Sequence, residues 1–79
     1  MLQIHRLPQV AAALGLSRST VWLRVKQGQC PPPVRLGSRA VGWPSSEIEA
    51  LNAARVAGKT DDEIRELVTK LVIARQLVT

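Results

Sequence analysis

The chain has 79 residues with 46% hydrophobic residues, one cysteine and one histidine, which permits one small domain and excludes an intrachain disulfide. A single cysteine makes the cytosol the expected compartment, and we expect a cytoplasmic protein without a membrane span or a secretory signal. No spacing of metal ligands and no glycine-rich phosphate loop is present in the sequence, so no metal or other cofactor is predicted.

The net charge of +5 is unevenly distributed along the chain. Residues 1–46 contain six basic residues and no acidic residue, whereas residues 47–79 contain five basic and six acidic residues. Such an asymmetry within one domain predicts one surface that binds a polyanion and a second surface that is close to neutral. The alternative interpretation is a solvated basic surface without a partner.

Two short helices joined by a tight turn are predicted near the N-terminus. Pro8 suits the first turn of a helix, where its missing N–H group costs nothing. Gly15 can adopt the left-handed conformation that ends this helix. Ser17 is a good N-cap for a second helix, which we expect to run from Arg18 to about Gln27 and to stop at Gly28. This order of signals is typical of a helix-turn-helix motif.

A β-hairpin is predicted after the second helix. Residues 30–33 read Cys-Pro-Pro-Pro and cannot be helical, so they form an extended connector. The segments Val34–Leu36 and Ala40–Trp43 alternate as strands do, around a turn at Gly37 and Ser38. The hairpin has a basic tip at Arg39, which makes it a candidate wing.

Two further helices complete the prediction. The third begins around Pro44, Ser45 and Ser46 and ends at Gly58, with a buried face formed by Ile48, Leu51, Ala54 and Ala57. The segment Thr60–Glu63 is a capping box that starts the fourth helix. The apolar stripe of the fourth helix consists of Ile64, Leu67, Val68, Leu71 and Val72, and it is widened by Ile73, Ala74, Leu77 and Val78.

The predicted fold class is mainly α: a winged helix-turn-helix with a two-stranded β-hairpin wing and a C-terminal helix. Residues 1–58 form the predicted DNA-binding domain. Residues 59–79 form the amphipathic helix, which either packs on the same domain or makes a homodimer. No enzyme activity is expected, because the sequence contains no catalytic motif. Asp61, Asp62 and Glu63 could form a carboxylate cluster, but they stand where a helix start needs capping carboxylates.

The second helix carries most of the candidate DNA-binding residues. Val21 and Val25 share the face that should pack on the first helix, and the polar positions beside and opposite that face are free to meet the major groove. The candidates on this element are Ser17, Arg18, Ser19, Thr20, Trp22 and Lys26. Arg18 can pair with a guanine edge or a phosphate, and the hydroxyls and Lys26 suit phosphate oxygens. Each could instead be an ordinary solvated side chain.

Aromatic residues and the hairpin supply the other candidates. Trp22 either contacts DNA or covers the edge of the core, and an exposed Leu23 would touch thymine methyl groups or a protein partner. Trp43 is expected in the core rather than as a stacking platform, since the chain has no Phe or Tyr. The hairpin candidates are Arg35, Ser38 and Arg39, with Arg39 suited to the minor groove and Arg35 to a flanking phosphate.

The chain also resembles a known family. The segments Arg6–Val10, Gly15–Trp22, Pro33–Trp43 and Ser46–Ile48, together with Gly28, are similar in order and spacing to the AlpA family of phage and prophage regulators. The resemblance covers about residues 4–55 and implies a MerR-like, excisionase-like winged helix-turn-helix in a bacterial or phage-infected cell. The family's recognition helix falls on Ser17 to Lys26 and its wing on Gly37 to Arg39.

Three features depart from the family pattern. Cys30 stands where the family usually has Phe, and Leu51 stands where it usually has Trp; both read as adjustments of the core. The tail from Gly58 to Thr79 has no counterpart in the short members of the family.

The sequence therefore predicts a sequence-specific double-stranded DNA-binding protein that regulates transcription on a phage, prophage or other mobile element. One alternative is an excisionase, a factor that sets the direction of recombination. An alternative of another class is a protein-interaction adaptor that uses the same fold. The expected partners are double-stranded DNA, a second copy of the chain through the C-terminal helix, and integrase or RNA polymerase.

Overall fold

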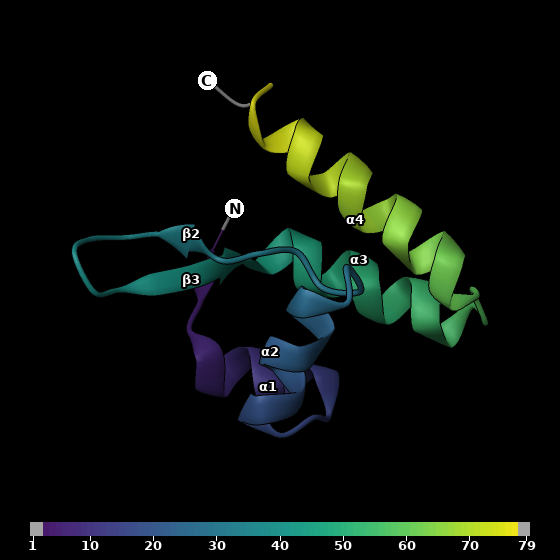
Figure 1. Ribbon diagram of the computed structural model, residues 1–79, viewed down its shortest axis with the longest axis horizontal. Coiled ribbons are helices and arrows are strands. Elements are labelled where there is room, and N and C mark those ends of the chain that lie inside the picture. The colour runs from purple at the N-terminus through teal and green to yellow at the C-terminus, as the bar shows by residue number, and fades with distance from the viewer. Residues whose placement is uncertain (1–2, 78–79) are drawn as a thin grey trace.

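The structure, a computed structural model that describes residues 3–77, is mainly helical with a small antiparallel sheet (Figure 1). Its helices are α1 (Leu7–Leu14), α2 (Arg18–Lys26), α3 (Ser45–Val56) and α4 (Asp61–Arg75). Its strands are β1 (Ile4–His5), β2 (Val34–Arg35) and β3 (Val41–Pro44). The predicted fold class is confirmed: two helices joined by a turn, a projecting hairpin and a C-terminal helix make a winged-helix-like architecture. Val78, predicted on the apolar stripe, lies outside the described residues.

The sheet has three strands in the order β1-β3-β2, although the sequence predicted two. Ile4 pairs with Pro44 and His5 with Trp43, so the segment before α1 forms an additional edge strand. A β-carbon on Gly42 would lie 2.5 Å from Cγ2 of Ile4, which explains why glycine occupies this position on β3. The third strand ties the N-terminal segment to the hairpin and so fixes the hairpin relative to α1.

The predicted signals of the helix-turn-helix are confirmed. Pro8 lies in the first turn of α1, and Gly15 ends that helix with a φ of 69°. The Ser17 hydroxyl caps α2 by accepting a hydrogen bond from the backbone N–H of Thr20 at 3.2 Å. Gly28, with a φ of 77°, follows the end of α2 and turns the chain toward the connector.

One hydrophobic core joins all four helices to β3. Its buried apolar residues are Val10, Ala11, Val21, Cys30, Trp43, Ile48, Leu51, Ile64 and Val68. Cys30 and Leu51, two of the three departures from the family pattern, are both core residues, as predicted. Ala57 was expected on the buried face of the third helix, but it is exposed because the helix ends at Val56 before Gly58 turns the chain.

The first half of α4 packs on α3, and an ion pair fixes its second half. The capping box is confirmed: Thr60 N donates to Glu63 Oε1 at 3.0 Å, and Glu63 N donates to Thr60 Oγ1 at 3.2 Å. The hydrogen bond that the Thr60 backbone N–H donates to the carboxylate holds the pKa of Glu63 below its usual range. Near the other end, Arg75 contacts both oxygens of buried Glu47, at 2.6 and 2.7 Å. No helix within residues 3–77 combines the length and the apolar character that a membrane crossing requires.

Trp43→Ala should lower the free energy of unfolding by about 3–5 kcal/mol, because it removes the largest fully buried side chain of the core. Denaturant titration measures this loss. Trp22→Ala is the matched control, since the Trp22 side chain is 42% exposed and its removal leaves a smaller cavity. Equal losses for the two variants would contradict the central place of Trp43.

Candidate nucleic-acid interface

The outer face of α2 is open to solvent. Val21 is fully buried and Val25 packs against the core, so this side of the helix faces inward as predicted. Arg18, Ser19 and Lys26 are exposed on the remaining surface. Leu23 is 50% exposed, and its apolar side chain is therefore available for contact. The helix presents basic, polar and apolar groups together on one accessible surface.

Three hydroxyl side chains gather at the N-terminus of α2. The Oγ atom of Ser17 lies 2.7 Å from Oγ1 of Thr20 and 3.2 Å from Oγ of Ser19. Ser17 and Thr20 are thus engaged in holding the first turn of the helix, while Ser19 is the more exposed of the two helical hydroxyl residues. The positive end of the helix dipole lies at the same place, and it favours an anion there.

Trp22 lies between α2 and the sheet. Its ring centroid is 5.5 Å from that of Trp43, with the two planes inclined by 53°. Trp22 covers the edge of the core and still exposes 42% of its surface, so both roles that the sequence left open are sterically available to it. Trp43 is fully buried and donates its indole N–H to the Pro31 carbonyl oxygen at 2.8 Å, which confirms its predicted core role.

The two faces of the sheet differ in what they present. Arg35 pairs with Val41, and Val41 shares a sheet face with Trp43 because alternate residues of a strand point to the same side. Arg35 therefore projects on the face from which Trp43 meets Trp22. Val34 lies on the opposite face, where it lines a groove beside α4. The sheet thus directs its basic side chain toward the α2 side of the molecule.

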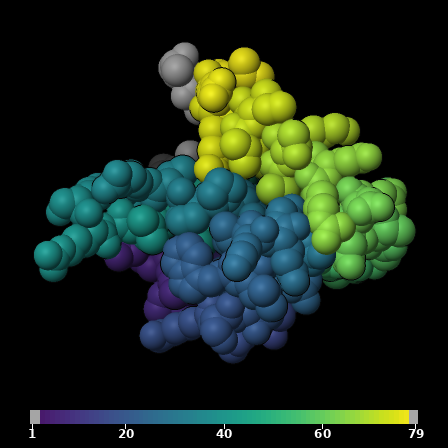
Figure 2. Space-filling model, in the orientation of Figure 1, coloured from purple at the N-terminus to yellow at the C-terminus, as the bar shows by residue number. Residues whose placement is uncertain are grey.

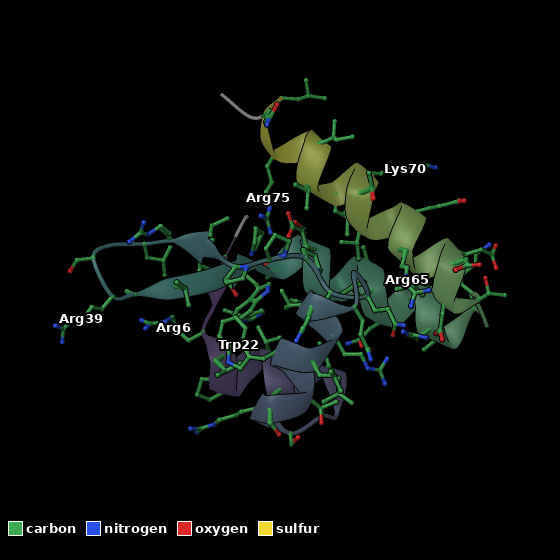
Figure 3. The ribbon with its side chains drawn as sticks, viewed as in Figure 1. Arg6, Trp22, Arg39, Arg65, Lys70 and Arg75 are labelled. Carbon is green, nitrogen blue, oxygen red and sulfur yellow. The ribbon has the colours of Figure 1, made fainter. Side chains whose placement is uncertain are left out.

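The wing loop consists of the three residues between the two predicted strand segments. Leu36 N donates to the carbonyl oxygen of Ala40 at 2.8 Å and closes a loop that contains Gly37, Ser38 and Arg39. The sequence predicted the turn at Gly37 and Ser38 with Arg39 at the tip, and all three residues belong to the loop. All three loop residues are exposed, and Figure 3 shows Arg39 at the far end of the hairpin.

Five basic residues of the N-terminal half form what we call the basic surface: Arg6, Arg18, Lys26, Arg35 and Arg39. Figure 3 shows Arg6, Trp22 and Arg39 on the same side of the hairpin, away from the cationic residues of α4. Within residues 3–77, every ion pair is formed by a basic residue of α3, of α4 or of the turn between them. The charges of the basic surface are accordingly not neutralised by carboxylates of the described chain.

Two basic residues of the first half differ from expectation. Arg24 is half-buried on the opposite flank of α2, where it donates to Gln29 Oε1 at 3.2 Å, so it does not contribute to the basic surface. Arg6 was not among the predicted site residues, yet it is exposed beside the hairpin (Figure 3). The charge asymmetry of residues 1–46 includes Arg6, but its place beside the hairpin depends on β1, a strand too short to predict.

Groups with catalytic potential have structural roles. Asp61 accepts a hydrogen bond from Arg55 at 3.0 Å, and this bond holds the pKa of Asp61 below its usual range. Burial, and then the nearby Glu47 carboxylate, raises the pKa of the Cys30 thiol to about 11, so the thiol is protonated at neutral pH. Among residues 3–77, no three His, Cys, Asp or Glu side chains are grouped as metal ligands.

Comparison with known proteins identifies the family of this chain. The family model described as "Prophage CP4-57 regulatory protein (AlpA)" matches residues 3–56, which include α1, α2, the sheet and α3. The uncharacterized protein ORF88 of Enterobacteria phage P4 is 44% identical over 54 residues, which are 68% of this chain. The chain matches 61% of the length of that relative. No solved structure matches the chain. The chain belongs to the AlpA family of prophage regulatory proteins.

Proposed function

We propose that this AlpA-family regulator binds double-stranded DNA with α2 in the major groove and the β2–β3 hairpin on the adjacent backbone or minor groove, and so controls transcription on a phage or prophage. The observation that carries the proposal is the basic surface, whose five cationic side chains have no carboxylate partner among the described residues. A surface of one sign, formed by an exposed helix and a projecting hairpin, suits a polyanionic duplex.

Each candidate residue has a role that follows from its position. Arg18, at the start of α2, is placed for a guanine edge, and Ser19 beside it suits a base or a phosphate. Lys26, at the other end of α2, suits a phosphate, and the Ser17–Thr20 cap presents the positive helix end to another. Trp22 fills the angle between helix and hairpin, where its exposed edge can meet a sugar or a thymine methyl group.

The hairpin extends the contact beyond the helix. Arg35 leaves the sheet on the α2 side and is placed for a phosphate flanking the major groove. The exposed wing loop carries Arg39 at its tip and Ser38 next to it. An arginine at the end of a narrow hairpin can enter the minor groove, where narrow A·T segments attract it, and a serine hydroxyl beside it can bind the backbone.

Two other readings use the same fold. Excisionase-type control of recombination, with integrase as the partner, would employ the same DNA surface as a promoter regulator that acts on RNA polymerase. Footprinting on neighbouring phage DNA separates the two, because the protected site lies either at an attachment locus or at a promoter. The hypothesis of a protein-interaction adaptor is favoured by the exposure of Trp22 and Leu23. It requires that the protein bind no duplex DNA.

The affinity for duplex DNA should fall steeply as salt rises. Each neutralised phosphate contributes about −0.9 to the slope of log K against log salt concentration, so four or five contacts give a slope of about −4. Fluorescence anisotropy with duplexes from the parent locus measures this slope. A flat salt dependence, or no binding to any duplex from that locus, would contradict DNA binding and favour the adaptor reading.

Arg18→Ala should cost about 1–3 kcal/mol on the specific site and less on random DNA, because a guanine contact carries sequence information. Lys26→Ala should weaken binding to both duplexes equally, since a phosphate contact does not depend on sequence. Titrating both variants on both duplexes gives the comparison. If Arg18→Ala loses the same on each, Arg18 contacts the backbone only.

Arg39→Ala should reduce the affinity for DNA without lowering the melting temperature, because the side chain at the wing tip is exposed and packs on nothing. Anisotropy and thermal unfolding measure the two effects. Lys70→Ala is the matched control, since Lys70 is exposed on α4, away from the basic surface (Figure 3). The wing assignment fails if the two variants bind DNA equally well.

A further inference from the structure

The segment that links α2 to β2, residues 27–33, contains three consecutive prolines. Proline has no backbone N–H group, so residues 31–33 can be held by backbone hydrogen bonds only through their carbonyl oxygens. The carbonyl oxygen of Pro31 accepts a hydrogen bond from the buried indole of Trp43 at 2.8 Å. Two more carbonyl oxygens of the segment, one near each end, accept hydrogen bonds from arginine side chains of α4.

Arg65 holds the first end of this segment, where α2 terminates. Its Nε atom donates to the carbonyl oxygen of Gln27, the C-cap residue of α2, at 3.0 Å. The last carbonyls of a helix have no partner within the helix and carry its negative partial charge, so a guanidinium is favoured there. The stem of Arg65 passes close to Gly28, because a β-carbon on Gly28 would lie 3.7 Å from its Cγ atom. Asp62 pairs with the same guanidinium at 3.0 Å and so orients it.

Arg75 holds the other end of the segment. Its Nη2 atom donates to the carbonyl oxygen of Pro32 at 2.8 Å, and both oxygens of buried Glu47 bind the same guanidinium. Arg65 and Arg75 lie near opposite ends of α4 (Figure 3), and ten residues advance about 15 Å along a helix. In Figure 2 the blue surface of α2 and of the segment that follows it lies between the teal hairpin and α4. The segment is therefore anchored to α4 at two separate points.

Each anchored carbonyl lies close in sequence to a candidate DNA contact. Gln27 directly follows Lys26, and Pro32 precedes Arg35 by three residues. Lys26 and Arg35 both belong to the basic surface but come from different elements. The phosphates of a duplex have a fixed spacing, so two cations can bind them together only when the protein holds the cations at a matching distance.

We propose that α4 is a positioning element for DNA binding, in which Arg65 and Arg75 anchor the two ends of the α2–β2 segment and so keep Lys26 and Arg35 at the separation that the duplex requires. The inference rests on the proposed DNA binding and assigns a role to a helix that does not touch the duplex itself. The family model matches residues 3–56, so it assigns no role to α4.

The anchor at Arg65 supplements the apolar contacts of α2. Trp22, near the middle of this helix, contacts Trp43, and Val21 packs in the core. A single point of contact near the middle of a helix leaves its axis free to tilt. The hydrogen bond from Arg65 adds a second, directional contact at the C-terminal end, next to Lys26, and so fixes the direction of the axis.

Amide hydrogen exchange of the full chain tests the first anchor without DNA. Arg65→Met removes the guanidinium and keeps an apolar stem beside Gly28. Exchange should become about fivefold faster at residues 27–29, whose N–H groups close the end of α2, because one hydrogen bond that holds this turn is lost. Lys70→Met is the matched control: it removes the same charge from an exposed position of α4 that takes part in none of the ion pairs within residues 3–77, and exchange should not change.

A double-variant cycle measures the coupling of this anchor to DNA. Fluorescence anisotropy should show that Arg65→Met weakens binding to the specific duplex at least about threefold, whereas Lys70→Met leaves it unchanged. Lys26→Ala should then cost at least about threefold less in the Arg65→Met background than in wild type, because a displaced Lys26 has already lost its phosphate. If Arg65 bound DNA directly and independently, the two losses would multiply.

The second anchor is tested in the same way with Glu47→Leu/Arg75→Met. This variant replaces the whole ion pair with apolar residues, a change that leaves no buried charge without a partner. Arg35→Ala should cost less in this background than in wild type, with thermal unfolding as the check that the variant is folded. The Arg65 cycle decides the proposal by itself if this variant does not fold.

Three results would overturn the proposal: exchange at residues 27–29 that is unchanged in Arg65→Met, an Arg65→Met chain that binds the duplex as wild type does, or losses for Arg65→Met and Lys26→Ala that multiply. A purely structural role of Arg65 gives the second result, since a folded variant would then keep its affinity. A wild-type chain that binds no duplex refutes the proposed function instead, and the exchange measurement still shows whether Arg65 anchors the end of α2.

Discussion

The burial of Trp43 is the constraint on which the arrangement of this protein depends. The indole is fully buried, its N–H is satisfied by the Pro31 carbonyl oxygen, and its backbone pairs with His5 of β1. One residue therefore connects the proline connector, the three-stranded sheet and the helical core. Because Trp43 also packs against Trp22, the angle between α2 and the hairpin is set inside the protein before any ligand is present.

This constraint also separates the two faces of the sheet. Strand alternation sends Trp43 and Arg35 to the side of α2 and Val34 to the side of α4, so the one exposed cation of β2 lies on the same side of the sheet as α2. Carboxylates are concentrated at α3 and α4, where they form ion pairs, cap helices or lie on the surface of α4. The five cationic residues of the basic surface form no ion pair within residues 3–77, which is why they carry the proposal of DNA binding.

Local signals in the sequence account for most of the fold, and long-range geometry accounts for what they missed. Pro8 and Gly15 act through their own backbone, and Ser17 acts through a hydroxyl that bonds only three residues away, so these helix ends could be predicted from the sequence. A two-residue strand such as Ile4–His5 has no periodicity of its own and exists only through its pairing with β3. The inward direction of Arg24 depends on Gln29, which lies beyond the end of its helix.

The candidate site likewise combines features that local sequence signals predict with features that only the three-dimensional structure determines. A position on α2 could be assigned from helical periodicity, whereas the direction of Arg35 depends on strand register, and the groove beside α4 depends on how far the helix stands from the sheet. The ion pair between Arg75 and Glu47 fixes that separation, since both partners are largely buried and Arg75 also donates to the Pro32 carbonyl oxygen at 2.8 Å. A buried ion pair is directional where apolar packing is not, and here it holds the end of α4 near the connector. The apolar side chains of Ile73 and Leu77 stay exposed on the outer side of this end of α4, so the ion pair and not apolar burial fixes where the helix lies.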